Sequence, residues 1–378
     1  MICMTNKNRI KSCQWTLFAR PRRVSILCSI AILPILAISN PGCVSMDLRY
    51  IFTAGAGQLN VVSNAVSLDK VLSDPTLEDQ THEKLLWIRQ VRDYARDSLG
   101  LKVKKTYTTF YDTGDGPAAY NLSASRKDAL EPLTWKFPII GKIQYLGYFK
   151  EAQANEKARQ LEAKGYDVTI YGAMAYSTLG YFRDPVFSSI LVLDEGRLAE
   201  LVIHELTHNT VYSTSDSEFN ESVATFVGRK GSREFICQTL GADCELLKQA
   251  DDLLQDNQIV NDFMAEVYDD LQAFYARTDL TSEQKIALRE SLFLAARQRY
   301  TDEIAPKLNN PQRFASIGNM PINNAWILLN RRYNKDMKIF EDVYQACNQD
   351  LVAAIEVFKW AAKSGNSYQA LQNWLQGR

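Results

Sequence analysis

Two of the three histidines in the 378-residue chain flank a glutamate in the segment His204-Glu205-Leu206-Thr207-His208. The surrounding stretch 197–209 carries leucine and valine at helical spacing, which predicts a helix. Residues four apart lie on one face of a helix, so both imidazoles can bind one cation. Glu205 can then take a proton from a metal-bound water, whose pKa zinc lowers to about 7. The alternative is a helix with two hydrogen-bonded core histidines, but the motif in this context favours a catalytic Zn²⁺ site.

A third ligand must come from elsewhere in the chain, because catalytic zinc is usually held by three protein side chains. His82 lies among charged residues on a helix that is predicted to face solvent. A carboxylate therefore remains, and Glu221 lies in the next helical segment with Ala224 one turn later, where a small side chain lets the two helices approach closely. Glu218 is the alternative ligand. Asp216 is a candidate acceptor for the free N–H of a ligating histidine.

Peptide hydrolysis also needs a donor that stabilises the oxyanion formed from the carbonyl oxygen. Tyr212, four residues after His208, is the predicted donor. Tyr176, Tyr181 and Arg183 remain alternatives, and each is also a plausible core or surface side chain.

The elements that must position these residues form an α+β pattern. A cap at Asp74 precedes an amphipathic helix over 78–99. Strands are predicted over 103–111, within 135–149, and over 166–171 and 186–193. The chain is mainly helical beyond Arg197, with helices over 240–254, 261–276, 281–300 and 340–362. The predicted fold is a small mixed sheet packed against a zinc-binding helix pair, followed by a mainly helical C-terminal half.

Composition and charge exclude some classes of protein. Apolar residues make up 46% of the chain, and 43 basic residues nearly balance 44 acidic ones, for a net charge of -1. No basic stripe with interleaved aromatic residues is present, so nucleic acid is not expected as a partner. We expect one peptidase domain over 44–378, with a helix and sheet part over 44–196 and the metal helices and helical C-terminal part over 197–378.

The first 43 residues are predicted to be an export signal. Basic residues precede an almost wholly apolar stretch over 24–38, and Gly42 and Cys43 follow. This layout is typical of a lipoprotein signal that is cleaved before an acylated Cys43, with an uncleaved anchor as the alternative. The protein is therefore expected in the cell envelope, membrane-anchored on the periplasmic face. In that oxidising compartment Cys237 and Cys244 could form a disulfide, and two buried thiols are the alternative.

An ordered series of segments after Cys43 resembles a known family, the predicted zinc aminopeptidases of bacteria, which are often exported or lipid-anchored. The matching segments are TWKFP at 134–138, YLGYF at 145–149, GYDV at 165–168, AYSTLGYF at 175–182, HELTH at 204–208, FNE at 219–221 and NNA at 323–325. The resemblance implies a gluzincin-type peptidase with zinc on His204, His208 and Glu221.

The substrate of such an enzyme is a peptide. The residues support the term metallopeptidase more strongly than the term aminopeptidase. In better-known glutamate-ligated aminopeptidases, a Gly-x-Met-Glu-Asn strand binds the free amine of the substrate. The segment Gly172–Tyr176 has Ala-Tyr in place of Glu-Asn. It can still be an edge strand that pairs with an extended peptide, or else a plain core strand. An amine anchor must then come from elsewhere, with Asp184, Asp194 and Glu195 as candidates.

We therefore expect an exported zinc metallopeptidase, an aminopeptidase in particular, with Glu205 as general base. One alternative is a zinc endopeptidase of the cell envelope. The other is an envelope lipoprotein whose zinc only braces the fold, against which Glu205 argues, since structural zinc sites are usually closed by four protein ligands and need no such carboxylate.

Overall fold

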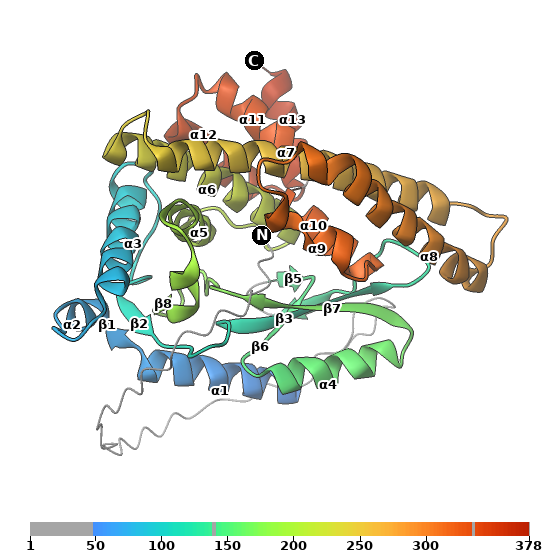
Figure 1. Ribbon diagram of the computed structural model, residues 1–378, viewed down its shortest axis with the longest axis horizontal. Helices are drawn as coiled ribbons and strands as arrows, with labels where there is room; N and C mark the ends of the chain where they lie inside the picture. Colours follow the sequence, from blue (N-terminus) through green and yellow to red (C-terminus); the bar gives the residue numbers. More distant parts are fainter. Residues whose placement is uncertain (1–47, 138–140, 335–336, 378) are drawn as a thin grey trace.

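Two consecutive helices carry the predicted metal ligands, α5 (Glu195–His208) and α6 (Ser217–Leu240), and they lie at the centre of the molecule (Figure 1). The structure is a computed structural model that describes residues 48–137, 141–334 and 337–377. The predicted export signal over 1–43 lies outside the described residues. Within them, no helix combines the length and the apolar character needed to cross a membrane.

Both central helices begin at an aspartate that caps the helix N-terminus. The Asp194 side chain accepts a hydrogen bond from Arg197 N at 2.8 Å, and Asp216 accepts one from Phe219 N at 2.9 Å. Each bond satisfies a backbone N–H that has no partner within the helix, which fixes where the helix starts. The cap at Asp216 follows soon after the end of α5 at His208, which leaves only the short loop 209–216 between the two helices.

The two helices cross closely because small residues of α6 face α5. Ala224 is fully buried, and a Cβ atom added to Gly228 would lie 2.9 Å from Glu200 O and 3.3 Å from His204 Cβ. A side chain at position 228 therefore meets the backbone of α5 and the base of a predicted metal ligand. This contact sets the distance between the helices.

The α+β fold class is confirmed, with the strands divided among three small sheets. The largest has the order β6-β3-β7, in which β3 (Ala119–Arg126) pairs antiparallel with β6 (Leu146–Tyr148) and with β7 (Tyr166–Ala173). The second has the order β1-β2-β8, formed by β1 (Val66–Ser67), β2 (Thr109–Tyr111) and β8 (Val186–Phe187), with β2 and β8 parallel. The third pairs β4 (Trp135–Phe137) with β5 (Gly141–Ile143).

The structure corrects two predicted strands and adds two, β1 and β3. The predicted strand over 103–111 is β-structure only at Thr109–Tyr111. The one over 186–193 is a strand only at Val186–Phe187, and a 3₁₀ helix, η1 (Ser188–Val192), follows. Phe187, Ile190 and Leu193 are each at most 1% exposed, and this spacing of three fits a 3₁₀ helix. The central strand β3 was not predicted, because the buried residues Ser123 and Ser125 are polar and interrupt the apolar pattern by which a strand is recognised in a sequence.

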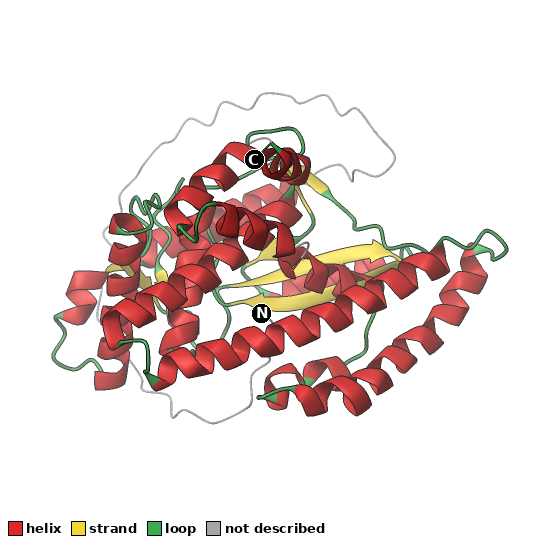
Figure 2. Cartoon of the chain, turned by 90° about the horizontal axis from the view of Figure 1, so that it is seen from above, coloured by secondary structure: helices red, strands yellow, loops and turns green. Residues whose placement is uncertain are grey.

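Helical layers cover both faces of the largest sheet. In Figure 1, α1 (Leu48–Asn64) and α4 (Glu151–Glu162) lie on one side, and α10 (Asn324–Asn334) lies on the other with α8 (Ser282–Arg299). Figure 2 shows the strands near the centre of the molecule, surrounded mainly by helices. A buried ion pair joins sheet and helices: Arg289 of α8 bonds Asp167 of β7 through Nη1 at 2.6 Å and Nη2 at 2.8 Å.

Several of the remaining helices pack on α5 or α6. The predicted helix 78–99 is confirmed as α3 (Asp79–Asp97), which packs on α5, with the short α2 (Leu68–Leu72) before it. The predicted helices 240–254 and 261–276 are one continuous helix, α7 (Glu245–Tyr275). The predicted helix 340–362 is two, α11 (Met337–Ala346) and α12 (Leu351–Ala361), and α9 (Ser316–Asn319) and α13 (Ser367–Gln376) complete the set. Asn348 and Gln349, both at positive φ, separate α11 from α12.

The three cysteines within the described residues are free thiols. Cys237 and Cys244 are partly buried and Cys347 is buried. Of the two sequence-based alternatives for Cys237 and Cys244, the structure therefore shows the thiols.

We expect Gly228→Ala to lower the free energy of unfolding by about 1–3 kcal/mol, because the new methyl group overpacks the helix crossing. The matched control is Gly55→Ala in α1, where an added Cβ has no atom within 4 Å. Alanine is the better helix former, so this control gains up to about 1 kcal/mol. Urea unfolding of both variants checks this, and equal stabilities would contradict the crossing as the tight contact.

Candidate metal centre

His204, His208 and Glu221 form a group that could hold a metal ion. Their ligand atoms all lie within 4.8 Å of one another. Glu221 Oε2 is 3.4 Å from His204 Nε2 and 3.7 Å from His208 Nε2. The two imidazole rings, from successive turns of α5, stand nearly perpendicular at 86° with centroids 5.0 Å apart. The structure thus brings together the three residues that the sequence predicted as ligands.

The donor set fits a divalent cation of the zinc type. Zinc binds histidine nitrogen and carboxylate oxygen at about 2.0–2.2 Å, so tetrahedral ligands are separated by about 3.4 Å. The two measured distances to Glu221 agree with that separation. Three protein donors leave one tetrahedral position for a reactant, as in catalytic sites. Zn²⁺ itself remains a prediction, since the same donors also suit other transition-metal ions.

The loop between the helices is fastened to the helix that carries Glu221. Asn220 Oδ1 accepts from Ser213 N at 2.7 Å, and Asn220 Nδ2 donates to Ser213 O at 2.7 Å. Asn220 is 3% exposed, so this pair of bonds is shielded from water. Asp216, predicted to bond a ligating histidine, caps α6 through Phe219 N. Sequence reasoning assigned no role to Asn220, although it lies in the FNE segment.

The alternative ligand Glu218 lies one turn before Glu221. Its Oε1 accepts a hydrogen bond from Gln144 Nε2 at 3.4 Å. Among the described residues, the group of potential ligands contains Glu221 and not Glu218. The structure therefore supports the choice of Glu221.

Burial and mutual charge shift the pKa values of the four site residues. Burial raises the pKa of Glu205 to about 7, with a further increase from Glu221 and a decrease from His204. Burial opposes the charge of Glu221, but the two histidines and Arg332 together lower its pKa to about 2. Burial lowers the pKa of His208 to about 4. At His204 burial also lowers the pKa, but the hydrogen bond to Glu221 and the charges of the nearby glutamates together outweigh it, so the pKa is raised. The metal-free site is thus an ionised carboxylate between two unequal imidazoles.

The candidate oxyanion donors differ in their surroundings. Burial raises the pKa of Tyr212 to about 12, and the charge of Glu221 adds to this, which places the hydroxyl within electrostatic range of that ligand. Tyr176 donates to Gln58 Oε1 at 2.8 Å. Tyr181 is 66% exposed, and Arg183 is exposed. Because it lies near Glu221, Tyr212 remains a candidate for the oxyanion donor.

Two of the candidate amine anchors have other roles. Asp184 is fully buried and accepts from Thr178 N at 2.9 Å and from Thr178 Oγ1 at 2.6 Å, so it shapes its own loop. Asp194 caps α5. For Glu195, the backbone oxygen accepts a hydrogen bond from Trp87 Nε1 at 2.8 Å.

Sequence reasoning missed three residues near the site. Tyr107 is 1% exposed, and its amide donates to Asp184 O at 2.7 Å. Burial raises the pKa of its hydroxyl, and the charges of Glu205 and Asp184 raise it further. Tyr145 and Arg332 both lie within electrostatic range of Glu221. Only Tyr145 carried a signal, as part of the YLGYF segment.

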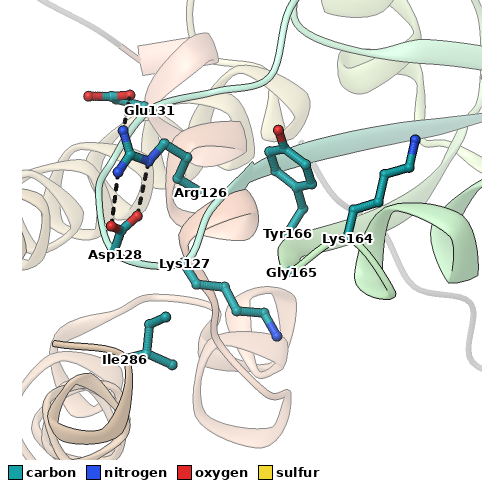
Figure 3. Close-up of a pocket in the computed structure, with 8 residues that line it drawn as sticks. All are labelled: Arg126, Lys127, Asp128, Glu131, Lys164, Gly165, Tyr166 and Ile286. Atoms are coloured by element: carbon teal, nitrogen blue, oxygen red, sulfur yellow. Dashed lines mark hydrogen bonds and ion pairs between the residues drawn. The ribbon is translucent and has the colours of Figure 1, made fainter. Parts of the chain in front are cut away.

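A cavity of about 480 Å³ lies away from the metal group (Figure 3). Arg126, Asp128, Glu131 and Tyr166 are among its lining residues, at the end of β3 and the start of β7. The Arg126 side chain is paired with Asp128 at 2.9 Å and with Glu131 at 3.2 Å, so its charge is already neutralised. This cavity shares no lining residue with the candidate metal centre.

Comparison with known proteins agrees with the geometry. A family model described as "Putative aminopeptidase" matches residues 49–370. The chain belongs to this family, which makes it an enzyme of the peptidase class with a candidate His/His/Glu metal site. No curated protein and no solved structure matched the chain.

We expect Glu221→Ala to weaken Zn²⁺ affinity by more than about 100-fold, because it removes a ligand and loss of an outer hydrogen-bond partner alone costs 10–100-fold. Glu218→Ala is the matched control and should keep its affinity within about threefold. Competition with a chromophoric chelator measures both. Full affinity in Glu221→Ala together with a loss in Glu218→Ala would reverse the assignment.

Cation binding should release protons between pH 6 and 8. Imidazoles bind metals in their neutral form, and both His204 and Glu205 have raised pKa values in the metal-free protein. Because protons compete with the metal, affinity should rise with pH, by at most about tenfold per unit for each proton released. Calorimetric titration in buffers of different ionisation enthalpy measures the release. Heats that do not depend on the buffer would contradict this.

Proposed function

We propose that this member of the aminopeptidase family is a Zn²⁺-dependent enzyme that removes residues from the N-terminus of peptides. The observation that carries the proposal is the largely buried His204, His208 and Glu221 group with the Glu205 carboxylate beside it. A structural site has no use for the fourth residue, whereas hydrolysis needs a base next to the cation. The family match supports the peptide as substrate.

Zn²⁺ held by the two histidines and Glu221 would polarise the substrate carbonyl and make water a stronger acid. Glu205 takes the proton of the attacking water as the water oxygen forms a bond to the carbonyl carbon. The C–N bond then breaks, and Glu205 passes the proton to the departing amine. Glu205 suits this cycle because burial raises its pKa to about 7 in the metal-free protein, near a working pH at which it can both accept and return a proton.

Strand β7 offers an edge for an extended substrate. In the order β6-β3-β7 it pairs on one side with β3, with Gly172 opposite Tyr120 and Ala173 opposite Ala119. An edge strand presents unpaired backbone groups that an extended peptide can bond. The strand ends at Ala173, and Met174 O accepts from Ser189 Oγ at 2.7 Å, so only the first part of the segment Gly172–Tyr176 is available for pairing.

The export and lipid anchoring of the enzyme are part of the proposal. Their support is the sequence of residues 1–43: a basic start, an apolar stretch and Cys43 at the boundary. The substrates would then be peptides of the cell envelope. Labelling with a radioactive fatty acid, and its loss in Cys43→Ser, tests this part independently of the chemistry.

The test of function is the hydrolysis of matched peptides with free and acetylated N-termini by the zinc-loaded protein. We expect cleavage of the free peptide only, restored by Zn²⁺ after chelation. Glu205→Gln should keep the metal and lower kcat by at least about 100-fold, since general-base catalysis supplies that much. Equal cleavage of both peptides would instead favour the zinc endopeptidase. Inactivity of the metal-loaded protein on a broad peptide library would favour the non-catalytic lipoprotein.

A further inference from the structure

Tyr145 lies in a segment that is fastened to the metal-binding helix. The segment connects β5 to β6, and Lys142 N donates to Thr214 O at 3.3 Å in the loop between α5 and α6. The neighbouring Gln144 donates from Nε2 to Glu218 Oε1 at 3.4 Å, one turn before Glu221. These two bonds hold Tyr145 against the start of α6. The Glu221 carboxylate and the Tyr145 hydroxyl are therefore within electrostatic range of each other.

Behind Tyr145 lies a buried cation, Arg332 of α10. It is 1% exposed, and its Nε donates to Gln144 Oε1 at 3.4 Å while Nη2 donates to Gln144 O at 3.2 Å and Ser123 Oγ at 3.3 Å. Its Nη1 is buried without a hydrogen-bond partner among the described residues. Burying a charged group with an unpartnered N–H is costly, so the burial of Arg332 calls for a reason.

The position of Arg332 gives that reason. Its Cζ lies 5.3 Å from the centroid of the Tyr145 ring, the geometry of a cation–π contact. Ser222 Oγ donates to Arg332 O at 3.3 Å, which joins α10 to α6 next to Glu221. The guanidinium thus lies behind the tyrosine ring on one side and within range of the acidic ligand on the other. Its positive field favours negative charge at this site.

The Tyr145 hydroxyl is free to bind a substrate. It makes no hydrogen bond to any residue within the described part of the chain, and the side chain is partly exposed. Tyr176, in contrast, is bonded to Gln58, and Tyr107 is enclosed at 1% exposure. A tyrosine hydroxyl is protonated at neutral pH, so it can donate.

We propose that Tyr145 donates the hydrogen bond that stabilises the oxyanion of the peptide carbonyl, and that Arg332 is a positioning residue that holds the tyrosine ring. This rests on the proposed peptidase function. As the water oxygen bonds to the carbonyl carbon, the π electron pair moves to the carbonyl oxygen and Glu205 takes the water proton. Tyr145 meets the new negative charge with its O–H and keeps its own proton throughout. Substrate pairing along β7 does not require this hydroxyl.

The test compares Tyr145→Phe with Tyr166→Phe, the same change in the cavity that shares no lining residue with the candidate metal centre. For Tyr145→Phe we expect kcat to fall by about 100-fold or more, as for loss of one oxyanion donor, with KM within about threefold. A phosphinic dipeptide, which mimics the tetrahedral oxyanion, should bind at least about tenfold more weakly by calorimetry. Zn²⁺ affinity and melting temperature should stay unchanged. Tyr166→Phe should keep kcat and phosphinate binding within about threefold.

Arg332→Met tests the positioning role through a double-mutant cycle with Tyr145→Phe. Phosphinate binding should weaken in Arg332→Met alone and lose no more in the double variant, because both changes remove one interaction. Additive losses would overturn the role of Arg332. Unchanged phosphinate binding in Tyr145→Phe, or a fall in its Zn²⁺ affinity that matches the loss of kcat, would overturn the role of Tyr145. If the wild-type protein neither cleaves peptides nor binds the phosphinate, the proposed peptidase function is wrong, and the proposed role of Tyr145 is wrong with it.

Discussion

The close crossing of α5 and α6 is the constraint on which the candidate site depends. Glu221 reaches both imidazoles because Ala224 and Gly228 let its helix approach the one that carries His204. The space is so limited that a methyl group at position 228 meets a backbone oxygen at 2.9 Å. The three donors lie within 4.8 Å of one another as a result of this packing, with Asp216 and Asn220 fixing the loop that returns the chain.

The site concentrates ionisable groups where water is largely excluded. Glu205, His208 and Glu221 are each at most 9% exposed, so their charges interact strongly. Their pKa values move apart accordingly: Glu221 stays ionised while Glu205 titrates near pH 7. Such a separation fits the roles proposed for the two carboxylates, Glu221 as ligand and Glu205 as proton acceptor.

The sheet and the C-terminal helices complete the site from the side opposite α5. The segment between β5 and β6 brings Tyr145 to the start of α6, and α10 places Arg332 behind it. The buried pair of Asp167 and Arg289, with Asn324 N bonded to Asp167 Oδ2 at 3.0 Å, fixes the start of α10 on the sheet. Residues far apart in sequence thus depend on one another for their positions, which accounts for a family match that spans nearly the whole chain.

The sequence by itself determined the local features. The spacing of His204 and His208 on one helix and the position of α3 follow from helical periodicity, which acts over a few residues. Glu221 was also predictable, because few candidates remained. The central strand β3, the 3₁₀ helix after β8 and the position of Arg332 were decided only by tertiary structure. Their side chains are buried by segments distant in sequence, and a serine in a buried strand or an arginine on a helix carries no local sign of what will cover it.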